Sequence, residues 1–332
     1  MIVQTVERES DAFQQPVSPD QIEAVCRRAF GEHARATRVV EIGVGTYNST
    51  YRVELEGREP VILRVAPDRA RQLGSDRDAM RNEYAAAPYF AALGDLVPRN
   101  LAVDFTHQLI GRDYLFQTLL PGVPASQGLD SYSEAARASY YRQLGAVTRA
   151  VHDVRGDCFG RVSGPGFATW REALADRFRT LARDYDEAGL GSGDIHRVIA
   201  ATETHRTALD EVGEPRLLHG DLWRLNILIE AGTDEPTITG ILDCDAASWG
   251  DPLADWTIHR VQQQAGTEVD AFWDTYGRPA TDAAAAVREL FYRARNLIGA
   301  RLDIDRRGIR LETVPPIHWD LTEVLTRLEV GD

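Results

Sequence analysis

Residues 217–230 read LLHGDLWRLNILIE, and this stretch decides how the rest of the chain is interpreted. Its apolar ends predict two short strands, so the polar residues between them lie on a connecting loop. Asp221 and Asn226 stand near the two ends of that loop. A second apolar run, which reads TITGILD, ends in Asp243. We expect these three oxygen-bearing side chains to lie near one another.

The chemistry of these residues favours phosphoryl transfer. Mg²⁺ prefers a few carboxylate or amide oxygens together with water and phosphate oxygens, and Asn226 and Asp243 match that requirement. Asp221 then remains free to accept a proton from a hydroxyl group, which completes the minimum that phosphoryl transfer needs. A second interpretation is a metal-dependent hydrolase that uses His219, Asp221, Asp243 and Asp245.

The composition is that of a globular protein. The chain has 332 residues, 43% of them hydrophobic and 27% charged, which suits one large or two medium domains. Cys26, Cys158 and Cys244 are scattered, which argues against a disulfide framework and for a reducing compartment. The N-terminus lacks the pattern of a signal peptide, and no apolar run approaches the roughly 20 residues that span a bilayer. We therefore expect a cytoplasmic protein.

The charge balance bears on the partners. A net charge of −14 disfavours nucleic acid and anionic membranes, because both require a basic surface. It suits a cationic ligand, although a solvated acidic surface would give the same value. The chain contains no lysine, so any role for a cationic side chain falls to arginine or histidine.

The first third of the chain is rich in strand patterns. Residues 1–16 are polar and expected to be loose. A helix is predicted from residue 18, with Ser18 as N-cap, Pro19 in the first turn and Gln21 completing a capping box. Another helix is predicted over 75–93, with Ser75 as N-cap. Alternating and β-branched runs predict strands at 38–42, 49–56, 60–66, 101–106 and 113–120.

The remainder of the chain is mainly helical. Helices are predicted over 133–154, 170–187 and 195–212, and further helices follow residue 256. Short strands are predicted at 216–218, 226–230 and 237–242. The chain therefore divides into a sheet-rich part and a larger helical part that carries the polar loop.

Two features of the sheet-rich part are suited to bind a nucleotide. The turn GVGTYNST follows a predicted strand and could cover phosphates with its backbone N–H groups, although Gly43 and Gly45 would also suit an ordinary hairpin. Arg64 is an isolated charge within the apolar run VILRV. Such a charge needs a partner, and Glu83 on the following predicted helix can provide one.

Together these segments resemble the aminoglycoside phosphotransferase and choline kinase family, which shares the two-lobe fold of protein kinases. HGDLWRLN resembles the family's H-G-D-x-x-x-x-N catalytic loop, ILDCD its metal-binding strand end, and WGDPLADW the segment that follows. Upstream, VGTYNSTYRV, VILRV and RNEY occur in the family's order. The resemblance implies an α+β protein-kinase-like fold. Residues 1–118 would form a small lobe with an antiparallel sheet and one main helix, and residues 119–332 a larger, mostly helical lobe.

The resemblance also implies roles for individual residues. Asp221 would be the catalytic aspartate that orients and deprotonates the acceptor hydroxyl, and Asn226 and Asp243 would hold Mg²⁺. Arg64, held by Glu83, would contact the α- and β-phosphates of ATP or GTP. Protein kinases have lysine at this position, but the fork of an arginine can grip phosphate oxygens with two hydrogen bonds.

Further nucleotide contacts are implied in the small lobe. The loop from Gly43 to Thr50 would cover the phosphates, with polar side chains in place of a third glycine. Residues 117–120 would form the hinge that faces the base, and His219 would brace the catalytic loop. The nucleotide contacts expected in addition to Arg64 and Glu83 are Gly43, Gly45, Asn48, Ser49, Thr50, Gln117 and Leu119.

The predicted acceptor is a small hydroxylated molecule. The family resemblance and the negative charge favour a cationic natural product, such as an aminoglycoside or basic peptide antibiotic, phosphorylated for resistance or self-protection. Candidate contacts are Asp245, Trp249, Asp251 and Trp170, although the two tryptophans are also typical of a packed core. The alternatives are a metabolite kinase of the choline, homoserine or ketosamine type, and a catalytically silent nucleotide-binding module.

Overall fold

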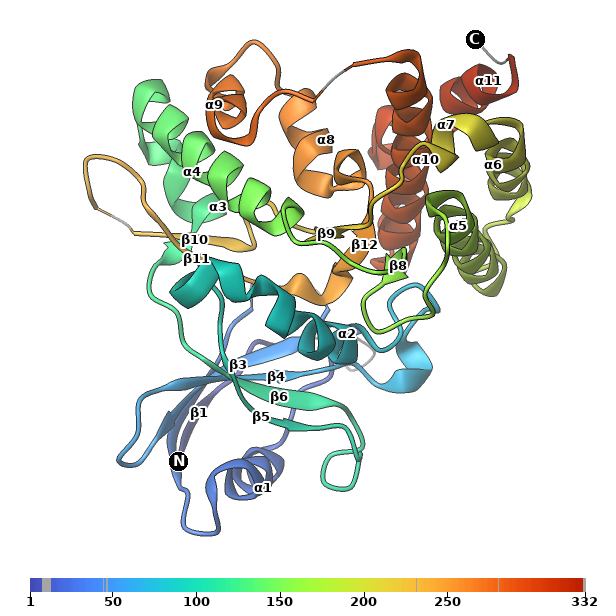
Figure 1. Cartoon of the computed structure of the whole chain (residues 1–332). Coiled ribbons are helices and arrows are strands. Elements are labelled where there is room, and N and C mark those ends of the chain that lie inside the picture. The colour runs from blue at the N-terminus through green and yellow to red at the C-terminus, as the bar shows by residue number, and fades with distance from the viewer. Residues whose placement is uncertain (8–12, 44, 46, 231, 280, 331–332) are drawn as a thin grey trace.

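The computed structural model describes residues 1–7, 13–43, 45, 47–230, 232–279 and 281–330. They form a smaller lobe built on a sheet and a larger lobe built mainly of helices (Figure 1). The predicted two-lobe α+β fold of the protein-kinase type is confirmed. No helix among the described residues is long and apolar enough to cross a membrane.

The smaller lobe contains a six-stranded sheet with the strand order β1-β2-β3-β4-β6-β5. Its strands are β1 (Ile2–Gln4), β2 (Ala36–Glu41), β3 (Ser49–Leu55), β4 (Val61–Val65), β5 (Asn100–Asp104) and β6 (Tyr114–Thr118). β1 pairs parallel with β2, and the other strand pairs are antiparallel, as predicted for this lobe. The expectation of a loose N-terminus fails for β1, because the backbone of β1 pairs with the edge of β2 that would otherwise be unpaired. Residues 8–12 of that segment lie outside the described part.

The first helix follows its sequence signals. α1 (Pro19–Phe30) begins after Ser18, whose hydroxyl accepts a hydrogen bond from the Gln21 amide, and Gln21 completes the predicted capping box. Ile22 and Val25 are fully buried and belong to the core of the small lobe, together with apolar residues of β2, β3 and β4.

The second helix starts later than predicted. α2 (Ala79–Ala86) follows Asp78, so Ser75 is not its N-cap. The cause is a contact distant in sequence: the Asp184 carboxylate accepts hydrogen bonds from the backbone N–H groups of Gly74 (2.7 Å) and Ser75 (2.9 Å). These bonds hold the preceding loop against the larger lobe and delay the start of the helix. A 3-10 segment, Ala87–Leu96, continues from α2.

The larger lobe contains the remaining helices and two small sheets. The helices are α3 (Ala125–Gly128), α4 (Glu134–His152), α5 (Trp170–Glu187), α6 (Gly193–Thr204), α7 (Arg206–Asp210), α8 (Trp256–Gln262), α9 (Trp273–Tyr276), α10 (Ala283–Arg306) and α11 (Thr322–Val330). One sheet has the order β11-β10-β7, from β7 (Val123–Pro124), β10 (Ile227–Ile229) and β11 (Ile238–Ile241). The other has the order β8-β12-β9, from β8 (Gly160–Arg161), β9 (Arg216–Leu218) and β12 (Ser248–Gly250).

The two small sheets position the polar loop of residues 219–226. This loop connects β9 to β10, whose apolar residues Leu217, Leu218, Ile227 and Ile229 are all buried. β11 pairs antiparallel with β10 and delivers the segment that contains Asp243 beside the loop. Burial of the strands therefore fixes both ends of the loop. Of its polar side chains, His219 and Asn226 are buried and Asp221 is partly exposed.

Candidate active site

The catalytic-loop candidates Asp221 and Asn226 are in direct contact. The Asn226 side-chain nitrogen donates hydrogen bonds to the backbone oxygen and to Oδ2 of Asp221, each at 2.8 Å. The amide thus fixes the orientation of the carboxylate. Since its nitrogen is used in this way, Asn226 keeps its Oδ1 as a free ligand oxygen.

The pKa of Asp221 is displaced towards neutrality. Burial of the carboxyl group is the largest cause, and the nearby charge of Asp243 raises the pKa further. Hydrogen bonds from Asn226 and Trp223 act in the opposite direction, and the resulting pKa is about 7. A carboxylate with this pKa is suited to accept a proton near neutral pH.

Asp243 and the small lobe meet in a chain of charged contacts. Arg64 on β4 donates from Nη1 to both carboxylate oxygens of Glu83 on α2, each at 2.6 Å, and from Nη2 to Asp243. The predicted ion pair between Arg64 and Glu83 is therefore present. Gln117 on β6 donates to Glu83 Oε1 at 3.0 Å and supports the pair from behind. The arrangement joins the two lobes through one guanidinium group.

Asp243 itself has an uncommon backbone. Its φ of 64° and ψ of 58° lie in the left-handed region, which residues other than glycine rarely adopt. This conformation ends β11 and turns the chain into the short 3-10 segment Cys244–Ala246. The carboxylate is thereby directed towards Arg64.

Asp255 holds the polar loop of residues 219–226, a contact that the sequence did not reveal. Its carboxylate is 1% exposed and accepts hydrogen bonds from the backbone N–H groups of His219 (2.9 Å) and Gly220 (3.2 Å). The His152 ring lies 3.0 Å away through Nε2, and its Nδ1 meets the Tyr276 hydroxyl at 2.8 Å. Burial alone would raise the pKa of Asp255, but the contacts with His152 and His219 lower it to about 2. Asp255 lies within the quoted WGDPLADW segment, yet nothing in that pattern indicates its partners.

The geometry of the loop also explains why residue 220 is a glycine. Gly220 has a φ of +82°, and a Cβ placed on it would lie 2.6 Å from the backbone oxygen of Ala246. The catalytic loop and the segment after Asp243 therefore approach each other more closely than a side chain allows.

Asn82 is a second residue whose role sequence reasoning missed. From α2 it donates to the backbone oxygens of Asp245 (2.8 Å) and Ala247 (2.9 Å), and its Oδ1 accepts from the Ser163 amide at 2.8 Å. Asn82 is fully buried. It ties the helix that carries Glu83 to the segment that carries Asp243, and only its place beside Glu83 in RNEY hinted at a role.

The glycine loop only partly matches its predicted contacts. Val44 and Thr46 lie outside the described residues, while Gly43 and Gly45 are exposed. Asn48 and Ser49 are buried, and the Ser49 hydroxyl donates to the Gln15 backbone oxygen at 3.0 Å. Ser49 is therefore bonded to the N-terminal segment instead of being open for a phosphate contact. Thr50 is half-buried and lies opposite Arg64 in the β3–β4 register.

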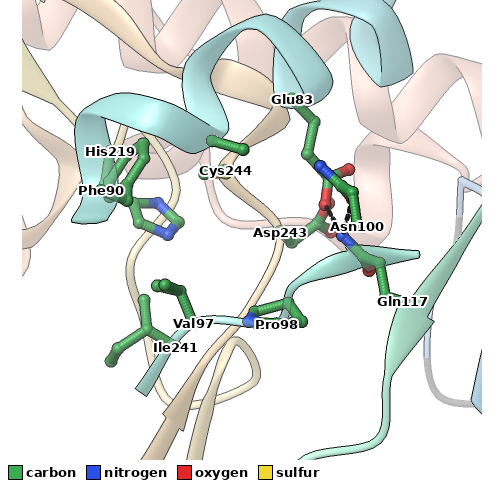
Figure 2. A pocket seen from close by; sticks show the side chains of 11 residues that line it. Glu83, Phe90, Val97, Pro98, Asn100, Gln117, His219, Ile241, Asp243 and Cys244 are labelled. Atoms are coloured by element: carbon green, nitrogen blue, oxygen red, sulfur yellow. Dashed lines mark hydrogen bonds between the residues drawn. The ribbon is translucent and has the colours of Figure 1, made fainter. Parts of the chain in front are cut away.

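The hinge candidates differ in what they can contact. Gln117 donates to Glu83 and, at 3.1 Å, to Asn100, so its side chain is occupied within the small lobe. Leu119 is 37% exposed. Figure 2 shows the Gln117 contacts at one side of a cavity of about 20 Å³ that also borders His219 and Asp243. The cavity has space for one water molecule.

Three of the four candidate acceptor contacts lie in the core. Trp170 is 5% exposed and donates to the Tyr292 hydroxyl at 2.9 Å. Trp249 is buried and packs edge-on against Tyr89. Asp251 is buried and accepts from Arg288 (3.0 Å) and Tyr292 (2.6 Å). The positions of these three side chains give no support to the acceptor-contact role expected for them.

Asp245 is the exception among these candidates. It is partly exposed and follows Asp243 by two residues. Burial within the surrounding protein and the charge of Asp243 raise its pKa well above the ordinary range.

The described residues contain no group of three or more His, Cys, Asp or Glu side chains placed to hold a metal ion. A tightly bound zinc, as the hydrolase interpretation requires, normally has three or four such ligands. Asn226 Oδ1 and Asp243 instead offer two oxygens, which fits an ion that keeps water and phosphate as its other ligands.

Comparisons with known proteins identify the family of the chain. The sequence profile of the phosphotransferase enzyme family matches residues 38–290. No curated protein matches the chain by sequence.

Several solved structures share the fold. A candidate aminoglycoside phosphotransferase from Ralstonia eutropha JMP134 is 17% identical, with a TM-score of 0.62 over 93% of this chain and 98% of that chain. A thermostable mutant of aminoglycoside phosphotransferase APH(4)-Ia, in complex with AMP-PNP and hygromycin B, is 17% identical, with a TM-score of 0.61 over 94% of this chain and 100% of that chain. A candidate fructosamine-3-kinase from Thermobifida fusca YX-ER1 is 19% identical, with a TM-score of 0.60 over 95% and 100%. At these identities the likeness concerns the fold.

Proposed function

The chain belongs to the phosphotransferase enzyme family, and from that premise we propose that it is a kinase that transfers the γ-phosphate of ATP or GTP to a hydroxyl group of a small molecule. The observation that carries the proposal is the constellation at the lobe junction. Asp221 is oriented by Asn226, and Asp243 is joined through Arg64 to Glu83. These are the elements that phosphoryl transfer requires, and they come from distant parts of the chain.

Asp221 is the proposed proton acceptor. Its Oδ2 is held by Asn226, and its pKa of about 7 suits it to take the proton of an acceptor hydroxyl near neutral pH. Asn226 Oδ1 and the Asp243 carboxylate are the proposed ligands of Mg²⁺. When bound there, Mg²⁺ neutralises the charge that develops on the phosphoryl group.

Arg64 is the proposed phosphate contact of the small lobe. The bond from Arg64 to Asp243 places the guanidinium group next to a proposed metal ligand, where phosphate oxygens would also lie. Glu83 and Gln117 fix the arginine from behind, so it requires little reorganisation when a nucleotide binds. The intact set of Asp221, Asn226 and Asp243 is the reason to prefer an enzyme over a silent nucleotide-binding module.

A cationic antibiotic is not part of the proposal. Two acidic residues of the larger lobe are bonded within the protein, Asp184 to the Gly74 and Ser75 amides and Asp251 to Arg288. Some structural neighbours are aminoglycoside phosphotransferases in complex with hygromycin B or kanamycin and others are candidate fructosamine-3-kinases, so the fold is compatible with either substrate class. We favour the metabolite-kinase alternative. We also propose a cytoplasmic setting, where nucleotide and Mg²⁺ are supplied.

A nucleotide-consumption screen tests the proposal. Purified protein would be incubated with Mg²⁺ and either ATP or GTP against a panel of hydroxylated metabolites and antibiotics, with the Asp221→Asn variant as the matched control. We expect acceptor-dependent consumption that the variant lacks. Tight binding of Mg·AMP-PNP or of Mg·GTP would support the nucleotide part of the proposal. If neither nucleotide binds, the proposal is overturned.

A further inference from the structure

Three arginines beside the active site lack carboxylate partners. Arg161 lies at the end of β8, Arg177 on α5 and Arg295 on α10. Within the part of the chain that the structure describes, none of the three has an Asp or Glu at ion-pair distance. Each donates to a backbone oxygen instead: Arg161 to Arg77 (2.6 Å), Arg177 to Ser75 (3.0 Å) and Arg295 to Ala254 (2.6 Å).

The protein occupies only part of the donor capacity of these side chains. A guanidinium group carries five N–H donors. Besides the backbone bonds, Arg295 donates to Asn296 Oδ1 at 3.1 and 3.4 Å. By contrast, Arg288 and Arg306, both also on α10, are paired with Asp251 and Asp76.

The three arginines lie close to one another. β8 packs against α5, and α5 packs against α10, which brings the three elements to one side of the larger lobe (Figure 1). Loss of hydration lowers the pKa of Arg161 and of Arg295, and in each case the charge of Arg177 is the next cause. We call Arg161, Arg177 and Arg295 the arginine cluster.

The arginine cluster adjoins the proposed catalytic residues. Arg161 on β8 pairs with Ser248 on β12. Strand β12 follows the segment that carries Asp243 and Asp245. Arg295 bonds the backbone oxygen of Ala254, next to the Asp255 carboxylate that holds the catalytic loop. The cluster therefore lies along the segments that border Asp221.

The cluster is accessible to a ligand. No Asp or Glu of the described residues lies at ion-pair distance from it, although Asp76, Asp184 and Asp245 lie near enough to attract its charges. Arg177 is exposed, and Arg161 and Arg295 are partly exposed. Of the neighbouring carboxylates, Asp184 accepts two backbone N–H groups and Asp76 is paired with Arg306. A net charge of −14 for the whole chain thus coexists with three neighbouring arginines that have no ion-pair partner among the described residues.

We propose that the acceptor carries an anionic group, a phosphate or a carboxylate, which the arginine cluster binds while the acceptor hydroxyl lies at Asp221. The inference rests on the proposed kinase function and specifies its substrate class. Arginine forks bind such oxyanions with paired, charge-assisted hydrogen bonds, and an anion would supply the ion-pair partner that the three guanidinium groups lack among the described residues. A polycation at the same place would be repelled.

The test measures binding of inorganic phosphate by calorimetry to protein saturated with Mg·AMP-PNP, so that the nucleotide site is occupied. Citrate in a parallel titration represents carboxylates. We expect phosphate or citrate to bind and Arg177→Gln to weaken binding about tenfold, the effect of losing one charge-assisted contact. Arg177→Lys should recover part of the loss. Arg183→Gln is the matched control, because Arg183 is exposed on the same helix and its one side-chain hydrogen bond within the described part of the chain is to Thr180.

Three outcomes would overturn the anionic acceptor: no binding of either anion, equal binding by wild type and Arg177→Gln, or tighter binding of kanamycin than of both anions. Failure of the proposed function is a separate result. If Mg·AMP-PNP does not bind, the kinase proposal falls, whereas the same anion titrations on nucleotide-free protein still decide whether Arg177 binds anions.

Discussion

Replacing Asp255 by asparagine should loosen the catalytic loop and destabilise the fold. The carboxylate of Asp255 is 1% exposed. The substitution replaces one of its two acceptor oxygens with an NH₂ group, which cannot accept a hydrogen bond. This group would then face either the backbone amides of His219 and Gly220 or the ring of His152. The pKa of Asp255 falls from the ordinary 3.8 to about 2 in the folded protein. A displacement of that size corresponds to about 2 kcal/mol of folding free energy at pH 7.

The sign of the pH dependence follows from the lowered pKa. The stabilisation by Asp255 is fully present above its unfolded pKa near 3.8, and it is lost as the pH falls through the folded value of about 2. The difference in unfolding free energy between wild type and Asp255→Asn should therefore be constant near neutral pH. It should shrink only as the pH falls below about 4.

Urea unfolding followed by tryptophan fluorescence, at neutral pH and at stepwise lower pH, measures this difference. Asp274→Asn is the control, because it removes a carboxylate from an ion pair with Arg142 in which both side chains are more than half exposed, and it should change stability little. Asp255→Asn should also lower kcat while leaving the nucleotide KM nearly unchanged, since the residue holds the loop without facing the phosphates. An unfolding free energy equal to that of wild type at pH 7 would refute the reasoning.

Further variants test the individual roles. Asp221→Ala should lower turnover about 10²–10⁴-fold with nucleotide affinity retained, as expected for loss of a positioned proton acceptor, and turnover within a few-fold of wild type would exclude that role. Asn226→Ala and Asp243→Ala should each abolish the Mg²⁺ dependence of ATP binding in calorimetry, and unchanged metal dependence in both would show that the ligands lie elsewhere. Arg64→Ala should raise the nucleotide KM more than about tenfold, because a charge-assisted phosphate contact contributes at least about 1.5 kcal/mol. Arg64→Lys should keep much of the affinity, and an unaltered KM in the alanine variant would contradict the assignment.

Local patterns were sufficient where the physical cause was local. Apolar runs on both sides of HGDLWRLN predicted the strands that hold the loop, and the capping box at Ser18 predicted the start of α1. The isolated charge of Arg64 in an apolar strand required a buried partner, and Glu83 is that partner.

Contacts between distant segments account for what sequence reasoning missed. The start of α2 depends on Asp184, which bonds Gly74 across 110 positions, and no pattern near Ser75 contains that information. Asp255 resembles an ordinary residue before a helix, and its bonds to the catalytic loop appear only once β9 and α8 are assembled.

The charge of the whole chain and the charges near the site lead to different proposals for the acceptor. The net charge of −14 suggested a cationic acceptor, but the charge near the site depends on which acids are already bonded. Asp184 and Asp251 are bonded within the protein, whereas Arg177 faces no carboxylate at ion-pair distance in the described part of the chain. Such pairing cannot be deduced from composition.

The central claim is that Asp221 serves transfer of a phosphoryl group to a hydroxyl, and one measurement tests it most directly. The protein would be incubated with Mg²⁺, hydroxylated phosphate and carboxylate metabolites, and ATP or GTP carrying a heavy oxygen isotope in the γ-phosphate, and the products analysed by mass spectrometry. The account predicts an acceptor that carries the intact labelled phosphoryl group with wild type and none with Asp221→Asn. Label recovered only in inorganic phosphate, or an equal yield of product from both proteins, would contradict it.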